Sequence, residues 1–192
     1  MDIPFRAMSG ELLISVDVEA SGDSPSNGSL LSIGACLVDD PQVGIYLELK
    51  LDPDMPWSAE AEGIHKLTRE HLTRDGLEPA EAMARLEEWV RDQAAGRWPV
   101  FVGFNAPFDW MFVADAFWRY LGHNPFGISA LDLKSLYMGA YGVKSWAETR
   151  KVHIERELGV RFEHTHNALE DARDQARLAQ VLLLQRRSIP RE

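Results

Sequence analysis

The sequence has little cysteine, no long apolar run and no excess of positive charge. Cys36 is the only cysteine among 192 residues, so no disulfide can form within the chain, as is typical of a reducing compartment. We therefore expect a cytoplasmic protein in which Cys36 is a small buried apolar residue. No apolar run approaches the roughly 20 residues that cross a bilayer, and residues 1–10 lack the basic and apolar parts of a secretory signal. No membrane association is expected.

The charge balance excludes one kind of nucleic-acid binding but not another. Lys and Arg together number 20 against 30 Asp and Glu, which gives a formal net charge of −10. A protein that coats long nucleic acid must neutralise many phosphates, and this charge argues against that role. An enzyme that binds only the end of a nucleic-acid strand is not excluded, because bound cations can supply positive charge locally.

The pattern of apolar residues predicts an α/β fold in a single domain over 1–192, with its core at about 11–185. Short apolar runs predict strands over 12–17, 30–38, 43–51, 99–104 and 130–133. Helical spacing predicts helices over 79–92, 105–121, 144–158 and 167–184. Three closely spaced strands followed by alternating helices and strands indicate a mixed sheet, whose first three strands are antiparallel and whose later strands are parallel.

Asp17 and Glu19 form a pair of carboxylates on the first predicted strand. Because strand side chains alternate between faces, two residues at this spacing point the same way. Two carboxylates on one face repel each other unless a cation lies between them, and Mg²⁺ or Mn²⁺ prefers such oxygen ligands. The alternative is an acidic strand end that faces water. The apolar run before Asp17, and Ser21 and Gly22 after the pair, which allow a tight turn, favour the metal site.

Asp109 stands alone among apolar residues at the start of a predicted helix. An unpaired buried charge is costly, so this carboxylate needs an explanation. Two explanations remain equally open. The helix dipole would favour a carboxylate in the first turn, and a metal shared with Asp17 would do the same.

His166 and Asp171 are five residues apart, or about 500° around a continuous helix, and would not share a helix face. They can meet only if His166 precedes the helix in a loop. Asn167 is a good N-cap, and Glu170 three residues later completes the pattern of a capping box, which supports that arrangement. The alternatives are a surface loop histidine and a carboxylate that only complements the helix dipole.

Taken in order, these five residues and their flanks resemble the three motifs of the DEDDh class of 3'–5' exonucleases. The resemblance covers roughly residues 11–185, and Ser32 to Gly34 resembles the second strand of that class. It implies a ribonuclease H-like fold with a mixed five-stranded sheet. It also implies that Asp17, Glu19, Asp109 and Asp171 hold two divalent metal ions, Mg²⁺ or Mn²⁺, and that His166 is the general base.

The same resemblance implies a substrate and a set of substrate contacts. The substrate would be the 3' end of single-stranded DNA or RNA, released as nucleoside 5'-monophosphates. The expected substrate-binding residues are Ala20, Ser21, Gly22, Ile64, His65, Asn105 and Phe108. The chain departs from the class at Ala20, where Thr is frequent, at Phe104, where His is common, and at Lys66, where Gly is common.

Several interpretations stay open at this point. The chain could be a catalytically silent nucleic-acid-binding or adaptor domain on the same fold, or a proofreading subunit with a polymerase partner. A homodimer is plausible because relatives form them. The basic residues Lys144, Arg150, Lys151 and Arg156 could track a phosphate backbone or form a solvated helix face. Trp146 could stack a base or pack against the core.

Overall fold

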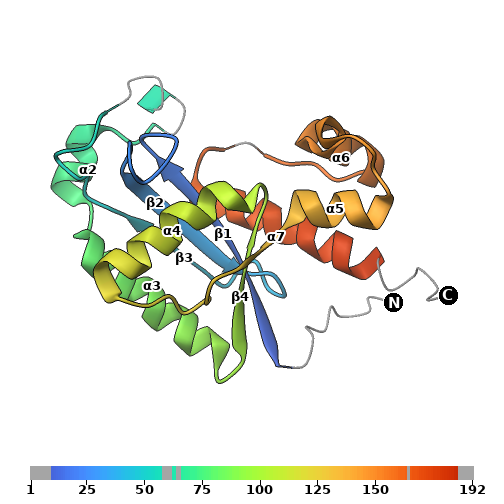
Figure 1. Cartoon of the computed structure of the whole chain (residues 1–192), viewed down its shortest axis with the longest axis horizontal. Coiled ribbons are helices and arrows are strands. Elements are labelled where there is room, and N and C mark those ends of the chain that lie inside the picture. The colour runs from blue at the N-terminus through green and yellow to red at the C-terminus, as the bar shows by residue number, and fades with distance from the viewer. Residues whose placement is uncertain (1–9, 58–61, 64–65, 164, 186–192) are drawn as a thin grey trace.

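The computed structural model describes residues 10–57, 62–63, 66–163 and 165–185 (Figure 1). Within these residues a five-stranded sheet has the order β3-β2-β1-β4-β5. Strands β3, β2 and β1 are antiparallel, whereas β1, β4 and β5 are parallel, so the predicted mixed sheet is confirmed. The strands are β1 (Glu11–Ala20), β2 (Leu30–Leu37), β3 (Gly44–Glu48), β4 (Trp98–Gly103) and β5 (Ala130–Asp132).

Helices cover both faces of the sheet. Helices α3 and α4 pack on one face, and α5, α6 and α7 gather on the other (Figure 1). None of the helices in the described residues is both long and apolar enough to cross a membrane. The helices are α2 (Arg69–Asp75), α3 (Pro79–Ala94), α4 (Ala106–Leu121), α5 (Leu133–Tyr141), α6 (Lys151–Leu158) and α7 (Ala168–Gln185), with a short 3₁₀ helix η1 (Trp146–Thr149).

Strand β1 lies at the centre of the sheet and separates two buried clusters. Leu12, Ile14, Val16 and Val18 belong to the cluster under α3 and α4. Because side chains alternate along a strand, the odd-numbered residues face α7, and Leu13 packs with the α7 cluster. Asp17 and Glu19 therefore lie on the α7 face, at the carboxyl end of the central strand.

Helix α7 lies in direct backbone contact with β2 beside these carboxylates. Gly34, which pairs with Asp17, has no side chain to separate the two elements. A Cβ atom at Gly34 would lie 2.1 Å from the carbonyl carbon of Ala168 and 2.1 Å from the amide nitrogen of Leu169. The start of α7 is thus held against the strand that borders β1.

One helical prediction needs correction, and two helices were not predicted. The single helix predicted over 144–158 is interrupted, because Arg150 has extended backbone (φ −68°, ψ 145°) between η1 and α6. Ser145 caps η1 by accepting the amide of Ala147, which starts a separate short turn. Helices α2 and α5 were not predicted. Cys36 is buried as expected, and burial raises the pKa of its thiol to about 12.

Candidate active site

Asp17 lies at the centre of a group of four carboxylates. Its pKa is raised well above the usual value, first because it is buried and then because Asp109, Asp171 and Glu19 add negative charge around it. The pKa of Glu19 is raised to about 7, mainly by burial and then by the charge of Asp171. These shifts show that the sheet end and the helices bring all four acidic residues into mutual electrostatic range.

Asp109 reaches this group from the first turn of α4. Its side chain is 3% exposed, and its Oδ1 accepts the backbone N–H of Val18 at 3.1 Å. Burial raises the pKa of Asp109 to about 8, although the hydrogen bond from Val18 opposes the shift. The helix dipole alone would not direct this carboxylate onto β1. The contact with Val18 fastens the start of α4 to the strand that carries Asp17.

Asp171 and His166 meet the group from the start of α7. The predicted N-cap is confirmed, since Asn167 Oδ1 accepts the amides of Leu169 at 3.1 Å and Glu170 at 3.2 Å. Asp171 lies in the first turn and is 8% exposed. His166 lies in the loop before the helix with φ 53°, and its side chain is exposed, as the sequence predicted.

The predicted capping box is wrong in its second half. Glu170 pairs with Arg173 at 2.5 Å, and the amide of Asn167 donates to Thr165 Oγ1 at 3.2 Å. Thr165 also donates from its amide and its hydroxyl to Asp171 Oδ1, each at 3.3 Å. Thr165 therefore takes the place expected of Glu170 and orients Asp171 as well.

The side chains of Glu19, His166 and Asp171 could share one cation. One ligand atom from each lies within 4.8 Å of the other two. Carboxylate oxygens are the donors that hard divalent ions prefer, and crowded, buried acids with raised pKa values are relieved by a cation. The donor set therefore fits a divalent metal ion. Lys151 is the positive residue that lowers the pKa values of Asp17, Glu19 and Asp109.

The residues expected to bind substrate fall into two groups. Asn105 is exposed at the start of α4 with φ 64°, and Phe108 is half-buried against Phe112, with ring centroids 5.3 Å apart. Both lie close in sequence to Asp109. Ile64 and His65 lie outside the described residues. Lys66, where the class often has Gly, has φ 59°, a backbone conformation that glycine adopts without strain.

The other group, Ala20, Ser21 and Gly22, lies where β1 ends and the turn to β2 begins. Ser21 is 4% exposed, and its hydroxyl accepts the amide of Ser29 at 2.8 Å and donates to the carbonyl of Pro56 at 3.3 Å. A Cβ atom at Gly22 would lie 2.5 Å from the Asn27 carbonyl oxygen. Gly22 thus lets the backbone approach another part of the same turn closely. Ala20 is half-buried against the α3–α4 cluster.

Sequence reasoning missed Gln175, which is 2% exposed and joins two parts of the site. Its Nε2 donates to Asp17 Oδ1, and its Oε1 accepts the amide of Phe104 at 2.9 Å. Gln175 lies four residues after Asp171, one helical turn away on the same face of α7. That spacing was the signal that could have revealed it.

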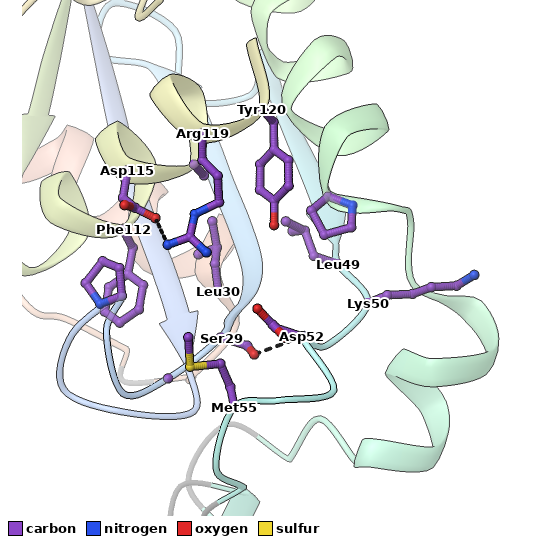
Figure 2. A pocket seen from close by; sticks show the side chains of 14 residues that line it. Ser29, Leu30, Leu49, Lys50, Asp52, Met55, Phe112, Asp115, Arg119 and Tyr120 are labelled. Carbon is purple, nitrogen blue, oxygen red and sulfur yellow. Dashed lines mark hydrogen bonds and ion pairs between the residues drawn. The ribbon is translucent and has the colours of Figure 1, made fainter. Parts of the chain in front are cut away.

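A separate small hollow lies between α4 and the loops that flank β2 and β3 (Figure 2). It has about 50 Å³ of space, enough for a few water molecules but not for a nucleotide. The Arg119–Asp115 ion pair at 2.9 Å lies on its wall, and no member of the carboxylate group lines it. This hollow is therefore not part of the candidate active site.

The fold and the carboxylate group together define the class of the protein. A mixed sheet in the order 3-2-1-4-5 presents Asp17 and Glu19 on the central strand, Asp109 on α4 and Asp171 on α7. His166 precedes Asp171 in the loop. This arrangement is that of a 3'–5' exonuclease of the DEDDh class.

The chain belongs to the family of 3'-5' exoribonuclease Rv2179c-like domains, a model of which matches residues 13–183. The 3'-5' DNA exonuclease Cap18 of Escherichia coli is 43% identical over 175 residues, covering 90% of this chain and 91% of that protein. A PolC-type DNA polymerase III of Pediococcus pentosaceus is 23% identical over 92% of this chain but only 12% of its own length.

Solved nuclease structures share the fold. The nuclease domain of 3'hExo, a DEDDh family member bound to rAMP, superposes with a TM-score of 0.76 at 13% identity, covering 92% of this chain and 94% of that one. Escherichia coli exonuclease I in complex with a dT13 oligonucleotide gives a TM-score of 0.68 at 18% identity and covers 88% of this chain. The chain spans 40% of that exonuclease I chain.

Proposed function

We propose that this exonuclease hydrolyses the 3'-terminal phosphodiester bond of single-stranded DNA or RNA in a metal-dependent reaction and releases nucleoside 5'-monophosphates. The observation that carries the proposal is the convergence of four carboxylates from β1, α4 and α7, with His166 beside two of them. The family description names RNA and the Cap18 relative is named for DNA, so both polymers are candidate substrates.

Asp17, Glu19, Asp109 and Asp171 are the proposed ligands of two divalent ions, Mg²⁺ or Mn²⁺. The raised pKa values of Asp17, Glu19 and Asp109 support this assignment, because protons or cations must offset the repulsion among neighbouring carboxylates. When bound, the ions supply positive charge to the scissile phosphate and make the attacking water more acidic. Gln175 and the Val18 amide hold Asp17 and Asp109 in place through hydrogen bonds.

His166 is the proposed general base. It lies in the loop just before α7, and one ring nitrogen is within 4.8 Å of carboxylate oxygens of Glu19 and Asp171. An exposed imidazole can take a proton from the attacking water and pass it to solvent. The N-cap at Asn167 fixes where the helix begins and so where His166 is presented.

A time course on 5'-labelled single-stranded DNA and RNA of equal sequence tests the proposal. Each reaction contains Mg²⁺, Mn²⁺ or EDTA, and wild type is compared with Asp171→Asn. We expect a metal-dependent ladder that shortens from the 3' end and slows by more than about 100-fold in the variant. Asp115→Asn is the matched control, because Asp115 is a carboxylate on α4 that pairs with Arg119 away from the site.

Two results would overturn the proposal. Full activity in Asp171→Asn would contradict the assignment of Asp171 as a metal ligand. Binding of the strand without nucleotide release in any metal would instead support a silent nucleic-acid-binding domain. A homodimer and a polymerase partner stay predictions, which size-exclusion chromatography with light scattering and co-purification can test.

A further inference from the structure

Two lysines and three aromatic rings form a continuous group next to the carboxylates. We call it the Phe104 ridge, and it consists of Phe104, Lys134, Trp146, Lys151 and Phe162. The Lys151 ammonium lies 5.4 Å from the ring centroid of Phe104 and 5.7 Å from that of Phe162. The Lys134 ammonium lies 5.9 Å from the Phe104 centroid and 4.3 Å from the Trp146 ring. The Phe104 ring thus contacts both lysines.

One end of the Phe104 ridge joins the active site. The amide of Phe104 donates to Gln175, which in turn donates to Asp17. Lys151 lies near enough to the acidic group to lower the pKa values of Asp17 and Glu19. The helices that carry the lysines, α5 and α6, lie on the same side of the molecule as α7 (Figure 1).

The other end of the Phe104 ridge faces solvent. Trp146 is 52% exposed, although a tryptophan side chain is largely apolar. The adjacent Lys134 also reaches Asn105 Oδ1 at 3.4 Å, which connects this end to the start of α4. An exposed tryptophan beside a lysine presents a flat apolar face and a positive charge together.

Neither lysine forms an ion pair with a carboxylate of the described residues, although acidic residues outnumber basic ones by 30 to 20 in the whole chain. Contact with an aromatic face stabilises an ammonium only weakly at an exposed site and leaves its N–H donors available. The position of Lys151 is explained by the nearby carboxylates, whose negative charge it offsets in part. This does not explain the position of Lys134 or the exposure of the Trp146 ring.

We propose that the Phe104 ridge binds the nucleotides immediately upstream of the scissile bond in a single strand. Lys151 and Lys134 pair with backbone phosphates, and Trp146 stacks an unpaired base. Exposed aromatic faces combined with unpaired cations are the means by which proteins hold single strands without reading their sequence. The proposal rests on the proposed function and adds to it a preference for strands longer than a dinucleotide. It also gives Phe104, which replaces the histidine common in the class, a structural role as the ring between the two lysines.

Steady-state kinetics on a substrate series test the base-stacking part. The series contains dinucleotides and hexanucleotides of DNA and RNA, and the readout is the ratio of kcat/KM between the two lengths. Trp146→Ala should reduce this ratio about tenfold, mainly through KM, and Trp146→Phe should restore much of it. Trp118→Ala is the matched control, because Trp118 on α4 is 54% exposed and lies outside the Phe104 ridge.

The salt dependence of the hexanucleotide KM tests the phosphate contacts. Lys134→Ala should lower the slope of log KM against log salt by about 0.7, the value for one phosphate of a single strand. Lys50→Ala is the control, because it also removes one positive charge but Lys50 pairs with Glu78 at 2.7 Å. This variant should have the same slope as wild type. A slope unchanged in Lys134→Ala would overturn the phosphate assignment.

The outcomes separate the two proposals. One outcome is that wild type degrades both lengths and the variants have the same ratio of kcat/KM between the two lengths as wild type. This would overturn the Phe104 ridge as a binding site and leave the proposed function intact. Fluorescence anisotropy of labelled hexanucleotide, measured in parallel in EDTA, tests the ridge even if no nucleotide is released. Weaker binding by Trp146→Ala than by Trp118→Ala then supports it, and equal binding overturns it.

Discussion

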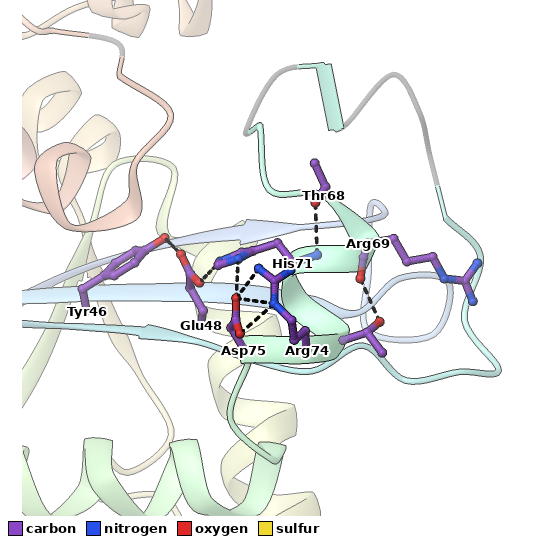
Figure 3. Close-up of polar contacts among 8 residues, drawn as sticks. Tyr46, Glu48, Thr68, Arg69, His71, Arg74 and Asp75 are labelled. Atoms are coloured by element: carbon purple, nitrogen blue, oxygen red, sulfur yellow. Dashed lines mark hydrogen bonds and ion pairs between the residues drawn. The ribbon is translucent and has the colours of Figure 1, made fainter.

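His71 joins helix α2 to strand β3 through Glu48 and also contacts Asp75 of its own helix (Figure 3). Its Nε2 lies 2.5 Å from Glu48 Oε2, and its Nδ1 lies 3.1 Å from Asp75 Oδ2. The hydroxyl of Tyr46 donates to Glu48 at 2.9 Å, and Arg74 pairs with Asp75 at 2.7 Å. Both ring nitrogens can donate only when the imidazole is protonated. The hydrogen bond to Glu48, and then the two nearby negative charges, accordingly raise the pKa of His71.

This raised pKa predicts a pH-dependent attachment of α2. A histidine whose pKa is higher in the folded state stabilises the fold fully below its ordinary value of about 6.5, and that contribution is lost as pH rises through the raised value. The urea midpoint of His71→Gln should therefore fall below that of wild type by more at pH 6 than at pH 8.5. An equal difference at the two pH values would show that His71 is not a protonated link.

The principal acidic residues of the site were predictable because each stands at a strand end or a helix start. Asp17 and Glu19 follow an apolar run, and Asp171 follows an N-cap, so their local structure could be inferred from the sequence. The electrostatic link between Lys151 and these acids depends on how α6 packs against the site. The break at Arg150 separates α6 from η1, and the helical spacing over 144–158 did not reveal that break.

Among the elements, the position of α7 depends on a glycine, Gly34, in the neighbouring strand β2. Gly34 on β2 lets the backbone at Ala168 and Leu169 approach so closely that a Cβ atom has no room. The second strand was predicted from its apolar run, and its glycine matched the pattern of the class. The structure shows why this residue is glycine, because the start of α7 packs directly against β2 at this position.

Gly34→Ala should displace the start of α7 and with it Asp171 and His166. We expect a loss of roughly 3 kcal/mol in the free energy of unfolding, because the obstructing atoms are backbone, and a larger loss of nuclease activity than of stability. Chemical denaturation and the 3'-end assay measure the two effects. The comparison variant is Gly139→Ala in α5, where a Cβ atom meets nothing within 4 Å. It should gain about 0.5–1 kcal/mol from helix propensity and keep full activity. Similar behaviour of the two variants would contradict the packing argument.

The elements that sequence periodicity missed are short ones. Helix α2 has seven residues and α5 has nine, too few turns for a clear amphipathic pattern. Helix α5 also begins directly where β5 ends, at Leu133, and the side chain of Asp132 caps it by accepting the amide of Ser135. The strand predicted over 130–133 therefore included the first residue of a helix.

For the whole molecule, the crowded carboxylates predict that metal binding and folding stability are linked through pH. Without metal, the folded state holds protons more tightly than the unfolded chain, since the pKa values of Glu19 and Asp109 are raised to about 7 and about 8. The stability that these groups contribute is complete below about pH 4 and is lost as pH rises through 7 to 8. A divalent ion should therefore stabilise the protein more at pH 8 than at pH 5.5.

Thermal denaturation with and without EDTA measures this linkage. At pH 8 and a metal concentration about 100 times its Kd, we expect Tm to rise by roughly 5–10 °C, and at pH 5.5 by much less. Asp171→Asn should lose most of the increase at pH 8, and Asp115→Asn should keep it. An increase of the same size at both pH values, or one that sodium chloride of equal ionic strength reproduces, would contradict the assignment of a divalent site.

The proposed ligands come from three segments far apart in the chain, on β1, α4 and α7. A nascent polypeptide that ends before His166 carries three of the four carboxylates and lacks both His166 and Asp171. On the proposed assignment, such a polypeptide lacks one metal ligand and the general base and is inactive. The order of the elements thus leaves the proposed active site incomplete during synthesis until α7 has been made and has packed on β2.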